Sequence, residues 1–285
     1  MKNVLVTGAK GQLGKCIRDI SKEYTHLHFL FTSKNELDIE DQDSVEEFFK
    51  YSNIDYCINA AAYTNVEKAE SEPNKAFKVN AEAVKNIAVA CNRYRSVIIH
   101  ISTDYVFDGK KKTPYRETDE INPLNVYGTS KLKGEEYIKE ICDEYFIIRT
   151  SWLYSQYGHN FFKTILNKSK EKELLKITTK QTGTPTNAND LVKETIKIIT
   201  NESTEYGLFH FSNSGEATWY DFAKTILQES KQIHQTKLEK TNHYRTFAAR
   251  PEYSVLDINK FCNTFNIKPR KWAESVQSLI NRYNY

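Results

Sequence analysis

The order of hydrophobic and polar positions divides the first half of the chain into alternating short and long elements. Short apolar, β-branched runs at residues 4–6, 27–31, 55–58, 97–101 and 145–148 are typical of buried strands. Apolar residues three and four positions apart predict helices over 12–23, 43–51, 74–94 and 128–142. Strands that alternate with helices in this way form right-handed crossovers. The pattern therefore predicts an α/β fold with a doubly wound parallel sheet, covered by helices on both faces.

The second half of the chain has a mixed pattern. Helices are predicted over 160–170, 188–200 and 219–231, extended segments over 174–178 and 208–211, and a last helix from near Trp272. Residues 232–251 are polar and are expected to be irregular. Since no repeat or low-complexity linker separates the halves, we expect two interleaved domains. Residues 1–150 would form the larger one and 151–285 mostly a smaller α/β domain, with parts of 170–215 completing the sheet.

Composition and charge exclude several classes of protein. Hydrophobic residues make up 39% of the 285 positions, and 40 Lys+Arg against 37 Asp+Glu give a formal charge of +3 without a basic cluster. We therefore expect no nucleic-acid partner. No apolar run approaches the roughly 20 residues that span a bilayer, and the N-terminal run is too short for a signal peptide. Five scattered cysteines without a CxxC pair indicate reduced thiols. The sequence predicts a cytoplasmic protein without a membrane partner.

Three glycines follow the first predicted strand and open the first helix. Gly8 permits a sharp turn, Gly11 lets the backbone approach a pyrophosphate, and Gly14 lets the helix pack closely on the sheet. The unpaired N–H groups of the helix N-terminus would then hold the anion. This spacing predicts a Rossmann-type domain that binds a dinucleotide.

The end of the second predicted strand bears on the choice of cofactor. It reads Phe31-Thr32-Ser33-Lys34, without the carboxylate that usually holds the adenosine ribose and would repel a 2′-phosphate. Lys34 could hold such a phosphate, so we hypothesise NADPH as cofactor, with NADH also accepted. The alternative, a solvated loop lysine, stays open. Asp38 could reach the adenine amine, and Ile39 could pack on the ring.

Hydroxyl groups and a lysine are spaced as carbonyl reduction requires. A strand predicted over 97–101 leads into Ser102 and Thr103, and Tyr127 and Lys131 share one helix face four residues apart. When hydride reaches a carbonyl carbon, a proton donor must stand beside the oxygen. Tyrosine can donate, and an ammonium nearby, with the oxidised nicotinamide, lowers its pKa. Side chains alternate along a strand, so only one of Ser102 and Thr103 can polarise the carbonyl.

Further motifs are spread along the whole chain. They are Gly11-Gln12-Leu13-Gly14, Asn59-Ala60-Ala61-Ala62-Tyr63-Thr64, Asn80, residues 102–109, Arg149-Thr150-Ser151-Trp152, Asn160-Phe161, residues 181–186, residues 210–216 with Trp219, and Arg250-Pro251 with Ser254. Together with Tyr127 and Lys131, these motifs resemble the extended short-chain dehydrogenase/reductase superfamily and, more narrowly, the dTDP-4-dehydrorhamnose reductase family. The resemblance favours Thr103, Tyr127 and Lys131 as the catalytic residues. It implies a dTDP-4-keto-6-deoxy-L-hexose as substrate and NAD(P)H as hydride donor.

The resemblance also implies binding residues. Contacts to the sugar would come from Thr103, Asp104 and Trp152, and we place Arg250 on the diphosphate because its planar guanidinium binds phosphate bidentately. Lys237 and Arg245 are alternatives for that role. Tyr127 and Lys131 would also contact the cofactor, Lys131 through the nicotinamide ribose. The remaining cofactor contacts would come from Gly11, Gln12, Leu13, Asp38, Ile39, Ala60, Ala61 and Ala62.

One departure from the family concerns metal binding. Some members dimerise around magnesium held by acidic side chains, one of them in the first helix, where this chain has Lys15. We therefore expect no metal site, and any homodimer should be independent of metal. Two other functions stay open: a different nucleotide-sugar reductase or epimerase of the superfamily, or a non-catalytic subunit resembling the regulatory subunit of methionine adenosyltransferase. The intact Thr103, Tyr127 and Lys131 argue against the last.

Overall fold

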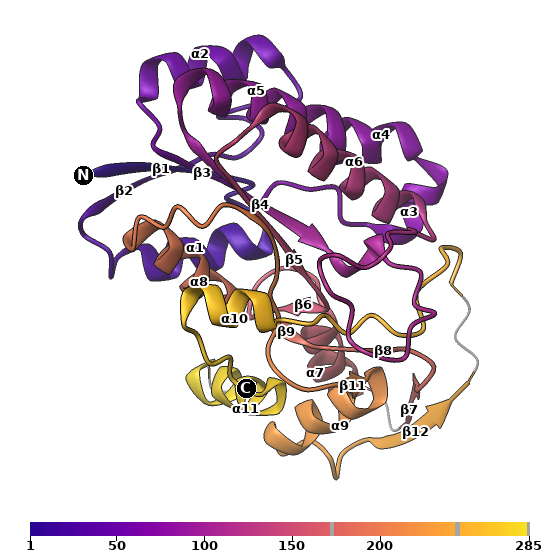
Figure 1. The fold of residues 1–285 in the computed structure, drawn as a ribbon. Coiled ribbons are helices and arrows are strands. Elements are labelled where there is room, and N and C mark those ends of the chain that lie inside the picture. Colours follow the sequence, from indigo (N-terminus) through magenta and orange to yellow (C-terminus); the bar gives the residue numbers. More distant parts are fainter. Residues whose placement is uncertain (172–173, 243–245, 284–285) are drawn as a thin grey trace.

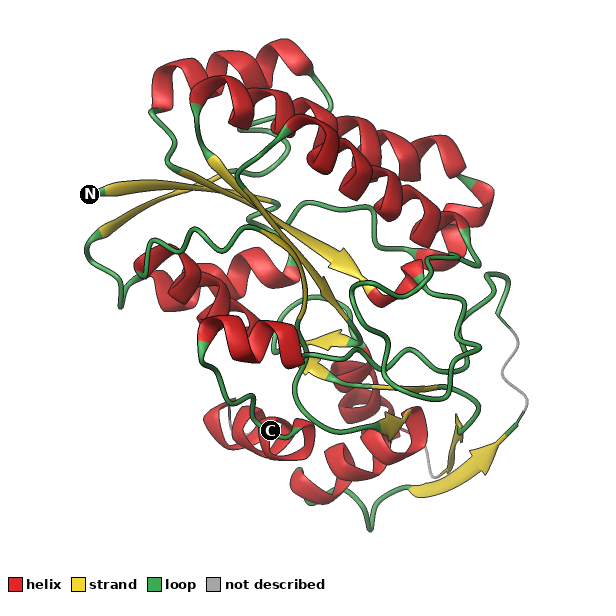
Figure 2. Ribbon diagram, in the orientation of Figure 1, coloured by secondary structure: helices red, strands yellow, loops and turns green. Residues whose placement is uncertain are grey.

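Six parallel strands form the central sheet of the computed structural model, which describes residues 1–171, 174–242 and 246–283 (Figures 1 and 2). The order across the sheet is β10-β5-β4-β3-β1-β2, and every pairing is parallel. The four inner strands are almost uniformly buried because helices cover both faces, as the unbroken apolar runs require, whereas the edge strand β2 is mostly half-buried. Their bounds are β1 Lys2–Thr7, β2 Leu27–Phe31, β3 Tyr56–Asn59, β4 Val97–Thr103, β5 Tyr145–Thr150 and β10 Gly207–His210.

Helices lie on the two faces of this sheet (Figure 1). One face packs on α1 (Gln12–Ser21) and α8 (Ala188–Thr200), the other on α2 (Gln42–Ser52), α5 (Ala83–Tyr94) and α6 (Val126–Ile141). The predicted doubly wound α/β fold is confirmed. From β1 the chain moves to β2 on one side, whereas β3 lies on the other, so the crevice between β1 and β3 is the topological switch point where ligands bind in such sheets.

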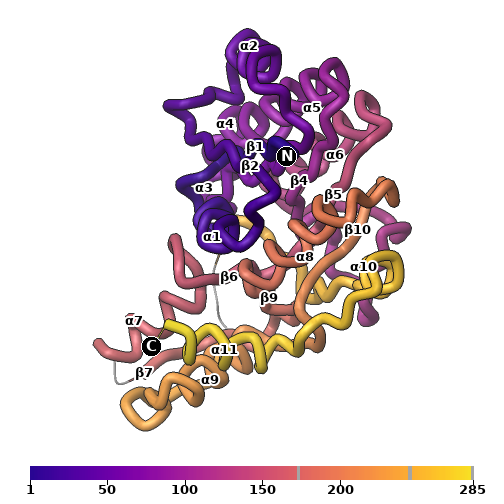
Figure 3. Tube along the Cα trace, turned by 90° about the vertical axis from the view of Figure 1, so that its left-hand side faces the viewer, coloured from indigo at the N-terminus to yellow at the C-terminus, as the bar shows by residue number. Residues whose placement is uncertain are grey.

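The C-terminal part forms a second, smaller layer below the carboxyl ends of the strands, and Figure 3 shows α9 and α11 running side by side there. Its apolar core is separate from the cores of the sheet and is centred on Tyr154, Phe162 and Phe222. The elements of this second lobe are β6 Leu153–Tyr154, α7 Phe161–Glu171, β7 Leu174–Thr178, β8 Thr182–Gly183, β9 Thr186–Asn187, β11 Ala217–Thr218, α9 Trp219–Glu229, β12 Lys237–Thr241 and α11 Trp272–Tyr283. The remaining helix, α10 Asn259–Phe265, packs against β10 and belongs to the core of the sheet.

Two expectations about elements differ from the structure. The helix predicted over 74–94 is divided into α4 (Pro73–Phe77), a π-helical turn (Lys78–Glu82) and α5, and is preceded by α3 (Val66–Ser71). The π turn buries Asn80, whose amide bonds Tyr63 and the Ser130 hydroxyl, so tertiary contacts decide the break. Residues 232–251, expected to be irregular, contain β12, which pairs in parallel with β7.

The length and polarity of the helices bear on membrane insertion. Among the helices of the described residues, none combines the length and the apolar character that a bilayer crossing needs.

Candidate active site

Three adjoining cavities form a continuous trough from the tip of β2 to the second lobe. The β2-side cavity, of about 430 Å³, and the central cavity, of about 420 Å³, share Gly11, Ala60 and Ala62. The central cavity and the lobe-side cavity, of about 590 Å³, share Tyr105 and Trp219 among other residues. The trough therefore has room for two ligands that meet in the central cavity.

The glycine loop shapes the β2-side cavity. Gly8 has φ +66°, and a Cβ there would lie 2.7 Å from the backbone nitrogen of Ala61, so only glycine allows the turn beside this neighbouring loop. Helix α1 begins after Gly11 without a side-chain cap and has no acidic residue in its first turn. Its first N–H groups are thus available for an anion, and these features fit the diphosphate of a dinucleotide.

Gly14 has a different position from the other predicted cofactor residues. A Cβ there would lie 2.5 Å from the carbonyl oxygen of Gly8, so the glycine lets α1 pack against the loop. It does not line any of the three cavities, whereas Gly8, Gly11, Gln12, Leu13, Lys34, Asp38, Ile39, Ala60, Ala61 and Ala62 do.

Side chains of both positive and negative charge lie near the carboxyl end of β2. Lys34 lines the β2-side cavity, but its side chain is 63% exposed and pairs with Glu40 and, at 3.7 Å, with Asp38. The expectation that no carboxylate stands at this tip needs a correction. Glu36 folds back, and one of its oxygens accepts a hydrogen bond from the Ser33 backbone N–H at 2.6 Å. A turn after the strand, which the order of residues does not predict, brings the Glu36 carboxylate back to the end of β2.

In the central cavity the structure separates the two candidate hydroxyls. The Ser102 hydroxyl donates to Glu135 at 2.5 Å and is thereby engaged with a buried ion pair. The Thr103 hydroxyl donates to Asp104 at 3.2 Å, lines the same cavity as Tyr127 and lowers the pKa of its phenol. Strand alternation has therefore directed Thr103, and not Ser102, toward Tyr127.

Tyr127 lies in the first turn of α6, next to the carboxyl end of β4. The side chain of Asn125 caps this helix by accepting a hydrogen bond from the Gly128 N–H at 2.8 Å. A Cβ at Gly128 would lie 2.2 Å from the carbonyl oxygen of Tyr105, so glycine permits the close approach. Burial raises the pKa of Tyr127 well above its ordinary value, and the hydrogen bond with Thr103 opposes that rise. The phenol therefore stays protonated, the form that a proton donor needs.

Lys131 is buried on the same face of α6, one turn further on. Its Nζ donates to the Ile101 carbonyl at 2.7 Å and lies 3.0 Å from His100 Nε2. Burial lowers the pKa of Lys131 to about 8, and the charge of Glu135 opposes that change. Both anchors of the amine come from β4, which fixes its position beside the cavity.

Asp104 follows Thr103 at the edge of the cavity and is 2% exposed. Burial raises its pKa from 3.8 to about 7, although hydrogen bonds from Ser254 and Thr103 lower it. Its charge in turn raises the pKa of Tyr127. The carboxyl group can therefore change its protonation state near neutral pH beside the phenol.

Aromatic side chains form the lobe side of the cavity. Trp152 has φ +44°, an uncommon backbone conformation for a bulky residue, and its ring stacks on Trp219 with centroids 3.6 Å apart. Phe161 packs on the Trp219 ring, with centroids 4.6 Å apart. A Cβ at Gly183 would lie 2.6 Å from the Trp152 ring, so a glycine makes room for this stack. The result is a rigid apolar wall beside the proton donor.

Arg250 lines the lobe-side cavity. Its guanidinium pairs with Glu67 at 2.7 Å and donates to the Tyr105 hydroxyl at 3.3 Å, which leaves its side chain 18% exposed. Lys168 and Lys176 also line this cavity, so three cationic side chains contribute to its lining. Of the two alternatives to Arg250, Lys237 pairs with Glu239, and Arg245 lies outside the described residues.

Several residues that line the trough or lie beneath it were not predicted as site residues. Trp219 follows a short strand, and its motif carried the family resemblance without any sign that its ring would face Trp152. His100 precedes Ser102 in a buried strand, where its apolar surroundings suggest only core packing. The others are Thr64, Val66, Tyr105, Phe161 and Gln181.

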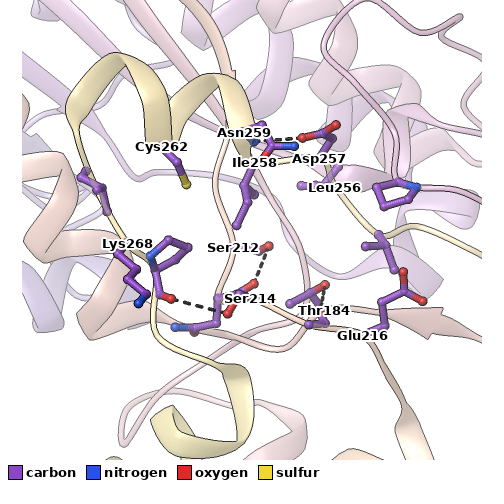
Figure 4. A pocket seen from close by; sticks show the side chains of 16 residues that line it. Thr184, Ser212, Ser214, Glu216, Leu256, Asp257, Ile258, Asn259, Cys262 and Lys268 are labelled. Carbon is purple, nitrogen blue, oxygen red and sulfur yellow. Dashed lines mark hydrogen bonds between the residues drawn. The ribbon is translucent and has the colours of Figure 1, made fainter.

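A further cavity, of about 440 Å³, lies beyond the carboxyl end of β10 and beside α10 (Figure 4). It contains none of the predicted site residues, and its hydroxyls are engaged with nearby backbone. Ser212 donates to the Asn213 carbonyl at 2.9 Å and Thr184 to the Gly215 carbonyl at 2.8 Å. We therefore assign no chemistry to it. Within residues 1–171, 174–242 and 246–283, no group of three or more His, Cys, Asp or Glu could hold a metal ion.

Comparison with known proteins places this geometry in a family. The model of the RmlD substrate binding domain matches residues 1–285. The dTDP-4-dehydrorhamnose reductase of Aggregatibacter actinomycetemcomitans is 38% identical over 98% of both chains. Two solved structures of dTDP-4-dehydrorhamnose reductases are also similar. One comes from Clostridium acetobutylicum (37% identical), and the other, in complex with NADP, comes from Bacillus anthracis (35% identical). Each has a TM-score of 0.94 and covers 99% of this chain and 100% of its own. These matches confirm the resemblance drawn from the motifs. The chain belongs to the RmlD substrate binding domain family, and its relatives include dTDP-4-dehydrorhamnose reductases.

Proposed function

We propose that this protein reduces the C4 keto group of dTDP-4-dehydro-L-rhamnose to give dTDP-L-rhamnose, with NADPH as hydride donor and Tyr127 as proton donor. The observation that carries the proposal is the position of Tyr127, Thr103 and Lys131. All three line the central cavity, between the cavity shaped by the glycine loop and the cavity lined by cations. The names of the relatives supply the substrate.

We assign the two ends of the trough to the two ligands. Residues 1–150 would bind the dinucleotide, with its diphosphate at the first turn of α1 and its adenine beside Asp38 and Ile39. Residues 151–285 would bind most of the nucleotide sugar, with Arg250 on the diphosphate and Trp152 against the hexose. The apolar and cationic lining of the lobe-side cavity supports this assignment, because a dTDP group combines a flat base with two phosphates.

Each catalytic residue has a separate role in this mechanism. Bound NADPH supplies the hydride. Thr103 donates a hydrogen bond to the keto oxygen, and Tyr127 gives its phenol proton to the oxygen as negative charge develops there. Lys131 stabilises the resulting phenolate and donates to the ribose of the cofactor. Burial keeps water from these groups and strengthens the interactions among them.

The direct test is an NADPH-oxidation assay with dTDP-4-keto-6-deoxyglucose and a 3,5-epimerase, with the product identified by NMR. We expect oxidation only when the epimerase is present, and a 6-deoxy-L-hexose as product. Equal turnover without the epimerase would assign the enzyme to a different nucleotide sugar. Absence of turnover with every dTDP-4-keto sugar tested would refute the proposed function.

Lys34 provides a test of cofactor preference. We expect Lys34→Ala to lower kcat/KM for NADPH roughly fivefold and to leave that for NADH unchanged, because an exposed ammonium adds a modest, salt-sensitive attraction to a 2′-phosphate. Steady-state kinetics with both cofactors measure this. Lys22→Ala is the matched control, since Lys22 is exposed at the end of α1 and does not line the trough. A strong NADH preference of the unaltered enzyme would contradict the assignment.

Asp104 predicts a pH dependence. As its carboxyl ionises near pH 7, its charge opposes phenolate formation at Tyr127, so we expect kcat/KM to fall as the pH rises through about 7. Asp104→Asn should remove this fall. The folded protein holds the Asp104 proton more tightly than the unfolded chain. The contribution of Asp104 to stability is therefore fully present below pH 3.8 and lost as the pH rises to about 7. An unchanged profile in the variant would assign the fall to another group.

We also propose that any homodimer of this protein forms without metal. Lys15 is exposed on α1, with its Nζ 5.7 Å from the centroid of the Tyr157 ring. Gel filtration before and after EDTA should give the same elution volume, and loss of a dimer on chelation would contradict the proposal.

The five cysteines are free, which supports a reducing compartment such as the cytoplasm.

A further inference from the structure

Four buried side chains form a chain beneath the central cavity that ends on Lys131. The Thr7 hydroxyl bonds the Asn59 amide at 2.7 Å, that amide lies 3.1 Å from His100 Nδ1, and His100 Nε2 lies 3.0 Å from Lys131 Nζ. Thr7, Asn59 and His100 are register partners on β1, β3 and β4, so they share one face of the sheet. None of the four residues is more than 2% exposed. The sheet therefore sets the geometry of this chain.

The chain bears directly on where Lys131 can place its amine. A lysine side chain is long and flexible, and holding it in one conformation costs entropy. Here two groups of β4, the Ile101 carbonyl and the His100 imidazole, contact Nζ from the strand beneath α6. Ile101 contributes backbone that any residue would provide. The imidazole is the one side-chain contact among those that hold Nζ in the described residues.

We propose that His100 is a positioning residue for Lys131, which it holds through the hydrogen bond between Nε2 and Nζ so that the amine serves Tyr127 and the nicotinamide ribose. This inference rests on the proposed function for its catalytic consequence. The contact itself does not depend on it. Asn59 and Thr7 support the imidazole from behind through Nδ1.

The charges around Lys131 make this contact measurable. Burial holds the pKa of His100 well below its ordinary value, so the imidazole is neutral and replacing it changes a hydrogen bond without changing the net charge. The titratable groups that face Lys131 are Tyr127 and Glu135 on its own helix and Asp104 after β4. Arg149, on β5, is paired with Glu135. A variant of His100 leaves all four in place.

Two substitutions separate hydrogen bonding from packing. His100→Met keeps a side chain of similar size and removes the hydrogen bond, whereas His100→Gln keeps a polar amide close to the position of Nε2. We expect kcat to fall roughly ten- to a hundredfold in the methionine variant and to recover most of that loss in the glutamine variant. His210→Met is the matched control, because His210 is an equally buried histidine on β10 whose Nδ1 contacts the Tyr115 carbonyl.

The decisive readout is the ionisation of Lys131, followed by the ¹³Cε resonance of lysine, which Lys131→Arg assigns. We expect His100→Met to move this titration by roughly half a pH unit or more, and His210→Met to leave it in place. If the pKa of Lys131 falls, Nε2 accepts a hydrogen bond from the ammonium in the unaltered protein. If this pKa rises, Nε2 donates a hydrogen bond to the neutral amine. Either result supports the contact. An unmoved titration in a folded His100→Met protein would overturn the proposal.

Folding and the proposed function are checked separately. Thermal unfolding shows whether His100→Met folds. If it does not, Asn59→Leu removes the support at Nδ1 and should shift the same titration, so an unmoved resonance there would count against the chain. If the unaltered enzyme reduces no dTDP-4-keto sugar, the proposed function fails. The Lys131 titration then still decides whether His100 positions the amine.

Discussion

Replacing Tyr127 by phenylalanine is expected to lower kcat by roughly a hundredfold or more while NADPH binds with nearly unchanged affinity. The substitution removes the phenol proton and leaves the ring, which packs edge-on against Tyr105 with centroids 5.8 Å apart. Without this donor the developing alkoxide must take a proton from water, in a cavity whose walls are largely buried. Steady-state kinetics give kcat, and the fluorescence of bound NADPH gives its Kd.

The control for this experiment is Tyr105→Phe. Tyr105 also lines the central cavity, and burial raises the pKa of its phenol to about 12, but its hydroxyl accepts a hydrogen bond from Arg250. We expect a higher KM for the nucleotide sugar and a kcat within about tenfold of the unaltered enzyme. Turnover of Tyr127→Phe at the normal rate would assign the proton to another group, and Asp104 would be the first to test.

Replacing Arg149 by methionine is expected to destabilise the fold by about 3–5 kcal/mol, the cost of leaving a buried charge without its partner. Arg149 and Glu135 are both fully buried, and the guanidinium contacts the carboxylate through Nε at 2.9 Å and Nη2 at 2.7 Å. In the variant, the remaining partners of Glu135 would be the Ser102 hydroxyl and, at 3.8 Å, Lys139. Urea unfolding measures the loss of stability.

A second substitution tests whether the cost comes from the unpaired charge. Adding Glu135→Gln to Arg149→Met removes that charge and keeps a hydrogen-bonding group for Ser102, so we expect the double variant to recover more than half of the lost stability. Equal instability of the single and double variants would show that packing, and not charge, explains the loss. Arg149 lowers the pKa of Glu135, so this part of the stability is present above pH 4.5 and disappears as the pH falls below it.

The buried pair also has a place in the site. Glu135 engages Ser102, which leaves Thr103 as the hydroxyl that faces Tyr127, and its charge opposes the lowering of the Lys131 pKa by burial. The proposed catalytic residues lie on β4 and α6, and the Glu135–Arg149 ion pair, which joins α6 to β5, supports them. We expect Arg149→Met to impair turnover at temperatures where the protein is still folded, through a displaced Ser102.

The sequence determined the fold class and the position of the trough because both follow from local patterns. Unbroken apolar runs require a sheet covered on both faces, and a strand followed by spaced glycines places a helix N-terminus at its carboxyl end. The four-residue spacing of Tyr127 and Lys131 places both on one helix face, whatever the rest of the chain does. In the structure Tyr127 and Lys131 line one cavity, and their catalytic roles stay a proposal.

Only the tertiary structure decided how these groups are held. Strand alternation alone left Ser102 and Thr103 as alternatives, and only the family resemblance favoured Thr103. In the structure Ser102 is bound by Glu135, which lies more than thirty positions away. Glu36 reaches Ser33 through a turn, Trp219 reaches Trp152 within the second lobe, and His100 meets Lys131 between a strand and a helix. Such contacts join residues that are distant along the chain or displaced by irregular loops. They depend on how whole elements pack, which a hydrophobic pattern does not encode.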